Sequence, residues 1–218
     1  MAYRAVIFDL DGTLVNTLED IAESANQALR QVSLPTHSVE AYRLKVGSGN
    51  RALVERALPA ERQDLVEAVL ASQLSYYEEH YYDHSRPYAG VEALLGRLSE
   101  EGLKLAVLSN KRDRFVLSLT ERCFGNGLFE IRWGQREGTP LKPDPASVLA
   151  LAAELGVSAG ETVFVGDSGV DMETARNAGM LAVGVAWGFR DRAELEGSGC
   201  EVFIERPEDL LGVLGTMN

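Results

Sequence analysis

Two aspartates stand two residues apart at the end of an apolar run. The run covers residues 5–8, and Asp9, Asp11, Gly12 and Thr13 follow it directly. A short run that is apolar throughout is typical of a strand buried on both faces, and a glycine favours a sharp turn. Both carboxylates are therefore expected to face one pocket. The alternative is an acidic turn that closes the strand and does no chemistry.

Three further groups of polar residues have the same kind of position. Ser109 and Asn110 end a second apolar run, where a hydroxyl and an amide can hold phosphate oxygens. Lys142 stands at the expected start of a helix, where a cation can meet an anion. Asp167 and Asp171 follow another apolar run and add carboxylates. All of these groups lie at or just after a predicted strand end, which a random acidic turn does not explain.

The elements that must position these residues alternate between strand and helix. Gly102, Gly156 and Gly179 stand where helices should stop. Alternation with short loops predicts an α/β fold with a doubly wound, Rossmann-like parallel sheet. The predicted strands are 5–8, 103–108, 129–133, 162–165, 182–185 and 202–204. The predicted helices are 91–101, 113–123, 145–155, 170–178, 191–196 and 208–214.

One stretch of about 70 residues breaks the alternation and carries only helical signals. It begins with a capping pattern at 17–20, and further helices are expected at 50–58 and 61–82. An insertion directly after the first strand lies above the carboxyl ends of the strands, where open α/β sheets bind ligands. We therefore predict a helical cap domain at 17–85 over a catalytic core of residues 1–16 and 86–218.

Composition and charge limit the partners of this chain. Its 218 residues are 45% apolar and 25% charged, an ordinary globular balance. The formal net charge is −12, which disfavours nucleic acid and anionic membrane surfaces as partners. An anionic substrate therefore needs a local positive site or a metal. Two cysteines without a CxxC pairing, and no long apolar segment, favour a soluble cytoplasmic protein.

Taken together, the motifs resemble those of the haloacid dehalogenase-like superfamily of hydrolases. The likeness covers nearly the whole chain, and the superfamily includes members with an all-helical cap at this point of the sequence. It implies that Asp9 is the nucleophile that becomes a transient aspartyl phosphate, and that Asp11 is the general acid and base. It also implies that Lys142 neutralises the Asp9–phosphate pair, while Thr13, Ser109 and Asn110 hold the transferring group.

The same resemblance implies Mg²⁺ as the cofactor. Its ligands are expected to be the Asp9 carboxylate, the Asp11 backbone carbonyl and Asp167. Asp171 is expected to orient a metal-bound water or to pair with Lys142, rather than to bind the metal directly.

Within the superfamily, the chain is similar to the phosphoglycolate phosphatases. Haloacid dehalogenases proper lack an equivalent of Asp11, and β-phosphoglucomutases usually have Glu-Asp where this chain has Gly-Asp. Residues 46–49, 87–91 and 109–111 match the phosphoglycolate phosphatase pattern. In the cap, Gly47 and Gly49 could present backbone N–H groups to a substrate carboxylate, with Arg51 nearby. Alternatively, the glycines form a plain connecting turn and Arg51 is a solvated charge.

The expected function is that of a Mg²⁺-dependent phosphatase for a small phosphorylated metabolite, with 2-phosphoglycolate as the leading substrate. The alternatives of the same chemistry are a sugar-phosphate phosphatase, a pyrophosphatase and a β-phosphoglucomutase-like phosphotransferase. A non-catalytic module that binds phosphorylated ligands is the remaining alternative. The chain is expected to act as a monomer or a homodimer.

Overall fold

The computed structural model describes residues 3–215, and its centre is a six-stranded parallel sheet. The strand order is β5-β4-β1-β6-β7-β8, so the order reverses on either side of β1. The doubly wound α/β prediction is confirmed. The strands are β1 (Ala5–Phe8), β4 (Lys104–Arg112), β5 (Ile131–Gln135), β6 (Thr162–Gly166), β7 (Leu181–Val185) and β8 (Val202–Ile204).

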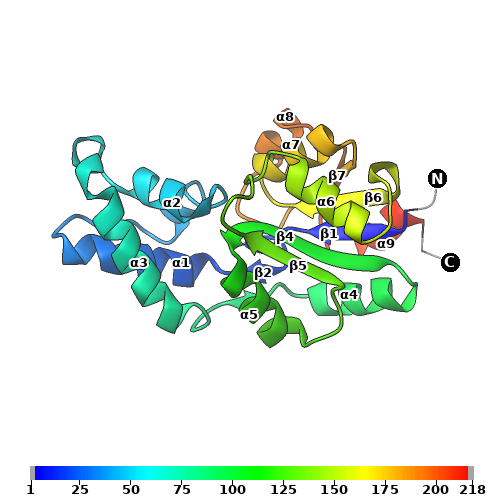
Figure 1. The fold of residues 1–218 in the computed structure, drawn as a ribbon, viewed down its shortest axis with the longest axis horizontal. Coiled ribbons are helices and arrows are strands. Elements are labelled where there is room, and N and C mark those ends of the chain that lie inside the picture. Colours follow the sequence, from blue (N-terminus) through cyan, green and yellow to red (C-terminus); the bar gives the residue numbers. More distant parts are fainter. Residues whose placement is uncertain (1–2, 216–218) are drawn as a thin grey trace.

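Helices cover both faces of this sheet, as the uninterrupted apolar runs predict. On β1, Val6 and Phe8 face one hydrophobic cluster, while Ala5 and Ile7 face the other. Helices α4, α5 and α9 pack in the first cluster, and α6, α7 and α8 in the second (Figure 1). Their bounds are α4 (Val91–Glu100), α5 (Asp113–Phe124), α6 (Ala146–Glu154), α7 (Gly169–Ala178), α8 (Arg192–Gly197) and α9 (Asp209–Leu214).

The inserted segment folds as a helical cap beside the carboxyl ends of the strands. It lies at one end of the molecule, far from both chain termini (Figure 1). A third hydrophobic cluster fills it, and Phe115 and Phe189 of the core also pack in that cluster. The elements are α1 (Leu18–Gln31), α2 (Gly49–Ala57) and α3 (Val66–His80), with 3₁₀ turns at Glu40–Tyr42 and Ala60–Leu65.

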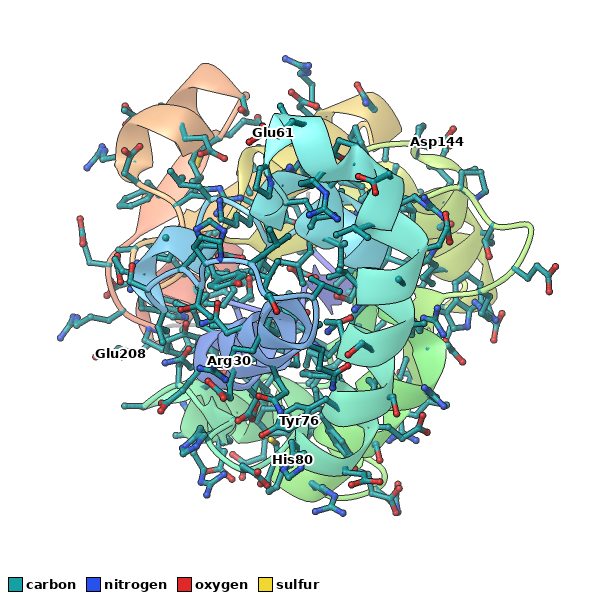
Figure 2. All side chains as sticks on the ribbon, turned by 90° about the vertical axis from the view of Figure 1, so that its left-hand side faces the viewer. Arg30, Glu61, Tyr76, His80, Asp144 and Glu208 are labelled. Atoms are coloured by element: carbon teal, nitrogen blue, oxygen red, sulfur yellow. The ribbon has the colours of Figure 1, made fainter. Side chains whose placement is uncertain are left out.

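The third cap helix differs from the sequence expectation. A single helix was expected over 61–82, but a 3₁₀ segment ends at Leu65 and α3 begins at Val66. Arg62, inside the 3₁₀ segment, has a non-helical backbone, so the chain is kinked before α3 begins. Figure 2 shows Tyr76 and His80 of α3 side by side on the outside of the cap, and their rings stack at 4.1 Å.

The two chain crossings between core and cap pair as a short antiparallel ribbon. Its strands are β2 (Val15–Asn16) and β3 (Arg86–Pro87), two residues each, which are too short for a periodicity to reveal. Helices α1, α2 and α3 all lie between these strands in the chain. We therefore propose the ribbon as the junction of a cap at 17–85 and a core at 1–16 and 86–218.

The start of the cap uses its polar side chains differently from the expected capping pattern. The Thr17 hydroxyl makes no cap hydrogen bond and donates instead to Asp11 Oδ1 at 2.7 Å. The buried Asp20 carboxylate accepts hydrogen bonds from the backbone N–H groups of His84 and Ser85 and from the Ser85 hydroxyl. Asp20 therefore ties the outgoing crossing to the returning one. Within residues 3–215, no helix is long and apolar enough to cross a membrane.

Candidate active site

The predicted site residues converge at the carboxyl ends of the three central strands. Asp9 follows β1, Ser109 lies near the end of β4, and Asp167 follows β6. Because β4 and β6 flank β1 on opposite sides, this edge is the topological switch point of the sheet. The cap elements close over the same edge, so the site lies between the two parts of the chain.

The turn after Asp9 is built for close contact with Asp167. Gly12 has a φ of +88°, and a Cβ at that position would overlap the Asp167 carboxylate. The Thr13 hydroxyl donates to Asp167 Oδ1 at 3.2 Å, and the Phe189 N–H donates to Oδ2 at 2.7 Å. Thr13 therefore holds a carboxylate in this structure, where the resemblance implies a phosphate-binding role.

Three buried carboxylates form a cluster that fits a hard divalent cation. Oxygens of Asp9, Asp167 and Asp171 lie within 4.8 Å of one another. Burial raises the pKa of Asp9 to about 6; Lys142 lowers it, while Asp171 and Asp11 raise it further. Burial, together with repulsion from Asp171 and Asp9, also raises the pKa of Asp167 well above its ordinary value. Such crowded carboxylate oxygens are the ligands that Mg²⁺ prefers.

Lys142 is the cation that pairs with two carboxylates of this cluster. Its Nζ lies 2.8 Å from Asp9 Oδ1 and 2.7 Å from Asp171 Oδ1. Burial disfavours the charged ammonium, but Asp171 and Asp9 outweigh it and hold the pKa of Lys142 above its ordinary value. The other Asp171 oxygen, Oδ2, accepts from the Ser168 N–H and hydroxyl at the start of α7. Asp171 is therefore anchored while it holds Lys142 beside Asp9.

The side-chain amide of Asn110 holds backbone groups of the core and of the cap in place around the site. Its oxygen accepts from the Lys142 N–H, and its nitrogen donates to the Lys142 carbonyl and to the Gly47 carbonyl of the cap. Both N–H bonds of the amide are thereby occupied. Asn110 joins the lysine segment to the cap, and Ser109 beside it lines the cavity.

Asp11 does not share the cluster around Lys142 but has a lysine of its own. Lys111 Nζ lies 2.9 Å from Asp11 Oδ1 and 3.1 Å from Oδ2, and both side chains are largely buried. Asp11 Oδ1 also accepts from Thr17. The two aspartates of the first motif thus have different cationic partners, because Asp9 pairs with Lys142 and Asp11 with Lys111.

A cavity of about 40 Å³ lies between these residues and the cap, with space for about three water molecules. Asp9, Asp11 and Lys111 line its core side. On the cap side it is lined by Ile21, Val46, Gly47, Gly49, Asn50, Leu53, Gln73 and Tyr77. The predicted cap glycines therefore do face the site.

Arg51 has a different position. It is exposed, forms ion pairs with Glu55 and Glu67, and is not among the residues that line the cavity. The cap is instead closed onto the core by other cations. Arg43 donates to the Gly188 carbonyl at 3.0 Å, and Arg190 donates to the Val46 carbonyl at 2.8 Å.

Comparison with known proteins decides the family. Residues 6–185 match the family model for haloacid dehalogenase-like hydrolases. The chain is also 32% identical to a phosphoglycolate phosphatase of Mannheimia succiniciproducens, over 97% of this chain and 98% of that protein. The chain belongs to the haloacid dehalogenase-like hydrolases.

Relatives of this hydrolase share its whole length. A phosphoglycolate phosphatase of Neisseria meningitidis is 34% identical over 97% of this chain and 90% of that protein. A solved structure from Lactobacillus delbrueckii subsp. bulgaricus aligns with a TM-score of 0.92 at 32% identity, covering 98% of this chain and 99% of that one. A predicted phosphoglycolate phosphatase from Haemophilus somnus aligns with a TM-score of 0.88 at 30% identity, covering 97% of each chain.

Three residues of this hydrolase's site carried no role in the sequence analysis. Lys111 stands directly after Ser109 and Asn110, so its place at the strand end was a signal that could have found it. Tyr77 and Phe189 had no such signal. They reach the site only because the cap folds over the sheet and the loop after β7 packs against the cap.

Proposed function

We propose that this hydrolase is a phosphomonoesterase that uses Asp9 as its nucleophile. The observation that carries the proposal is the ion pair of Asp9 with buried Lys142, beside Asp167, while Asp11 pairs with a different lysine. An ionised Asp9 oxygen attacks phosphorus, the bond from phosphorus to the leaving oxygen breaks, and Asp11 supplies a proton to that oxygen. Water then attacks the aspartyl phosphate, loses a proton to Asp11, and releases inorganic phosphate.

Charge compensation is the main contribution of the remaining residues. Lys142 neutralises negative charge that Asp9 and a phosphoryl group would bring together, and Asp171 holds it in place. Asp9, Asp167 and the Asp11 carbonyl would hold Mg²⁺, which when bound supplies Lewis-acid stabilisation of the phosphoryl oxygens. Ser109 lines the same cavity and offers a hydroxyl donor.

As substrate we propose 2-phosphoglycolate. Relatives named phosphoglycolate phosphatase, at 31–34% identity over most of the chain, support this choice. The positive charge of Lys111 in the cavity lining also suits a doubly anionic ester. A sugar-phosphate phosphatase, a pyrophosphatase and a phosphotransferase of the same superfamily would all use the same core residues. The two phosphatases differ from this proposal in their substrate, and the phosphotransferase differs in passing the phosphoryl group to an acceptor other than water.

The test is phosphate release from 2-phosphoglycolate and from an aryl phosphate, each with Mg²⁺ and with a chelator. We expect Mg²⁺-dependent turnover that is faster on 2-phosphoglycolate. The Asp9→Asn variant should lose at least about 1,000-fold in kcat, whereas Asp64→Asn, an exposed aspartate of the cap, should keep normal activity. Full activity of Asp9→Asn would refute the nucleophile, and turnover of the aryl phosphate alone would refute the substrate.

A further inference from the structure

The cavity contains one positive charge that the phosphoryl chemistry does not require. Lys142 already neutralises Asp9, and no step of the proposed reaction uses Lys111. Yet Lys111 is buried at the end of β4, lines the cavity, and has its ammonium 4.8 Å from the centre of the Tyr77 ring in the cap. An ammonium is costly to bury, so its position calls for an anionic partner.

Lys111 pairs in this structure with Asp11, which the proposed reaction needs at the leaving oxygen of the ester. Lys111 contacts both oxygens of Asp11, and Thr17 also donates to Oδ1. Under the proposed function, Asp11 must reach the leaving oxygen of the ester. The contact between Lys111 and Asp11 therefore has to open during turnover, and another anion has to replace Asp11 at the ammonium.

A second feature of the cavity points to the same ligand. The Tyr77 hydroxyl is buried, and among residues 3–215 no group accepts its proton, since the nearby Lys111 ammonium can only donate. Leaving the proton of a buried hydroxyl without an acceptor destabilises a fold. Since Tyr77 lines the cavity together with Lys111, an acceptor that enters the cavity can take the hydroxyl proton and remove this penalty.

The backbone on the cap side also favours negative charge. Helix α2 begins at Gly49, and both Gly49 and Asn50 at its N-terminus line the cavity. The N-terminal end of a helix carries a partial positive charge and free N–H groups. The buried ammonium, the hydroxyl without an acceptor and the helix N-terminus are together suited to a carboxylate, which only accepts hydrogen bonds, and poorly suited to neutral sugar hydroxyls.

We propose that Lys111 and Tyr77 form a subsite for a carboxylate on the substrate, separate from the phosphoryl site at Asp9 and Lys142. In this subsite the carboxylate replaces Asp11 as the partner of Lys111. The inference rests on the proposed function and deepens it, because it defines the substrate class as short phosphomonoesters that carry a second anionic group.

The experiment compares pairs of esters that differ in that group alone. One pair is 2-phosphoglycolate and 2-hydroxyethyl phosphate, and the other is 3-phosphoglycerate and glycerol 3-phosphate. For each, kcat/KM is measured with the wild type, Lys111→Gln, Tyr77→Phe and Lys104→Gln. Lys104, at the opposite end of β4, is the matched control, since it loses the same charge far from the cavity.

Wild-type enzyme should prefer the carboxylate ester of a pair. Lys111→Gln should reduce kcat/KM for that ester by roughly 10- to 100-fold more than for the neutral ester, because both esters are affected by the lost contact with Asp11 but only one loses a carboxylate partner. Tyr77→Phe should reduce kcat/KM for the carboxylate ester by several-fold more than for the neutral ester. Lys104→Gln should behave as wild type. Tyr77→Phe should also unfold at the wild-type temperature or above it, because it removes a buried hydroxyl whose proton has no acceptor.

Other outcomes separate the inference from the proposed function. A preference for 3-phosphoglycerate over glycerol 3-phosphate, without one for 2-phosphoglycolate, keeps the subsite and refutes the named substrate. Equal losses on carboxylate and neutral esters in Lys111→Gln and Tyr77→Phe overturn the subsite and leave the phosphatase in place. Phosphate release that favours neither carboxylate ester in the wild type also overturns the subsite.

Discussion

The backbone N–H of Phe189 donates to Asp167 Oδ2 at 2.7 Å, while the Phe189 side chain is buried in the hydrophobic cluster of the cap. The two residues that precede Phe189 in the same loop also form hydrogen bonds with other parts of the chain. The Gly188 carbonyl accepts from Arg43 of the cap, and the Trp187 indole donates to the Thr13 carbonyl in the turn that follows Asp9. The loop after β7 therefore joins the position of the cap to the position of a candidate metal ligand.

Replacing Phe189 with alanine should weaken the binding of Mg²⁺. In Phe189→Ala the ring no longer anchors the loop in the cap, so the N–H that orients Asp167 loses its fixed position. We expect the Mg²⁺ concentration for half-maximal activity to rise by roughly 10-fold, the usual scale for groups that orient metal ligands. Activity is titrated against Mg²⁺. The control is Phe129→Ala, which removes an equally buried ring from the core of the sheet. An unchanged Mg²⁺ requirement in Phe189→Ala would contradict the connection.

Alanine variants of Gly12 and Gly102 distinguish the effect of backbone strain on stability from the effect of a blocked site on activity. Both have positive φ, +88° and +79°, but a Cβ on Gly102 meets open space and one on Gly12 meets the Asp167 carboxylate. Gly102→Ala should reduce the free energy of unfolding by about 1 to 2 kcal/mol and leave activity normal. Gly12→Ala should abolish Mg²⁺-dependent turnover. Denaturant unfolding and phosphate release measure the two effects, and equal activity in both variants would argue against the close approach to Asp167.

The raised pKa of Asp9 predicts a pH-dependent stability in the absence of metal. The pKa of the Asp9 carboxyl rises from its ordinary value of 3.8 to about 6 in the folded protein. Between pH 3.8 and about 6, the folded protein therefore binds more protons than the unfolded chain. The free energy of unfolding should therefore fall as pH rises from about 4 to 6, by on the order of 3 kcal/mol. Thermal unfolding in a chelator measures the fall.

Two further measurements identify the groups that make the stability depend on pH. Asp9→Asn should flatten the pH dependence but not remove it, because Asp167 also has a raised pKa. Added Mg²⁺ should restore stability above pH 6, since the ion favours ionised carboxylates. A slope that Asp9→Asn leaves unchanged would show that other groups are responsible.

Asp20 should matter for stability although it lies outside the cavity lining. It accepts three hydrogen bonds from His84 and Ser85, so Asp20→Ala leaves buried donors unpaired at the junction of cap and core. We expect a loss of about 3 kcal/mol in the free energy of unfolding, measured in urea. Glu19→Ala, an exposed acid in the same helical turn, should change stability by less than about 0.5 kcal/mol. Similar losses in the two variants would mean that Asp20 has no special role.

Much of the candidate site could be predicted because the residues with reactive or phosphate-binding side chains lie at the ends of strands. Carboxyl ends of parallel strands share one edge of the sheet, so Asp9, Ser109 and Asp167 were expected to meet, and they do. Helix and strand positions in the core also followed from uninterrupted apolar runs and from glycines after the helices. The ribbon of β2 and β3 was missed because two residues carry no periodicity.

The cap residues show where sequence reasoning stopped. Arg51 and Lys111 are both cations close to a predicted motif, and the sequence offered Arg51 either as a reader of a substrate carboxylate or as a solvated charge, while it gave Lys111 no role. Packing of α2 against α3 directs Arg51 to Glu67 at the surface, while β4 carries Lys111 into the cavity. Which side of an inserted helix faces the sheet depends on contacts between segments that are distant in the chain.

The sequence alone therefore determined the fold class and the family resemblance and supplied the candidate residues of the reacting centre, because each depends on local spacing along single elements. Tertiary structure decided how the charges are paired. Only the folded chain places Lys142 with Asp9 and Asp171, Lys111 with Asp11, and the N–H of Phe189 on Asp167. Such pairs join residues from 22 to 133 positions apart in the chain, as their numbers show, and burial makes each pairing strong enough to matter.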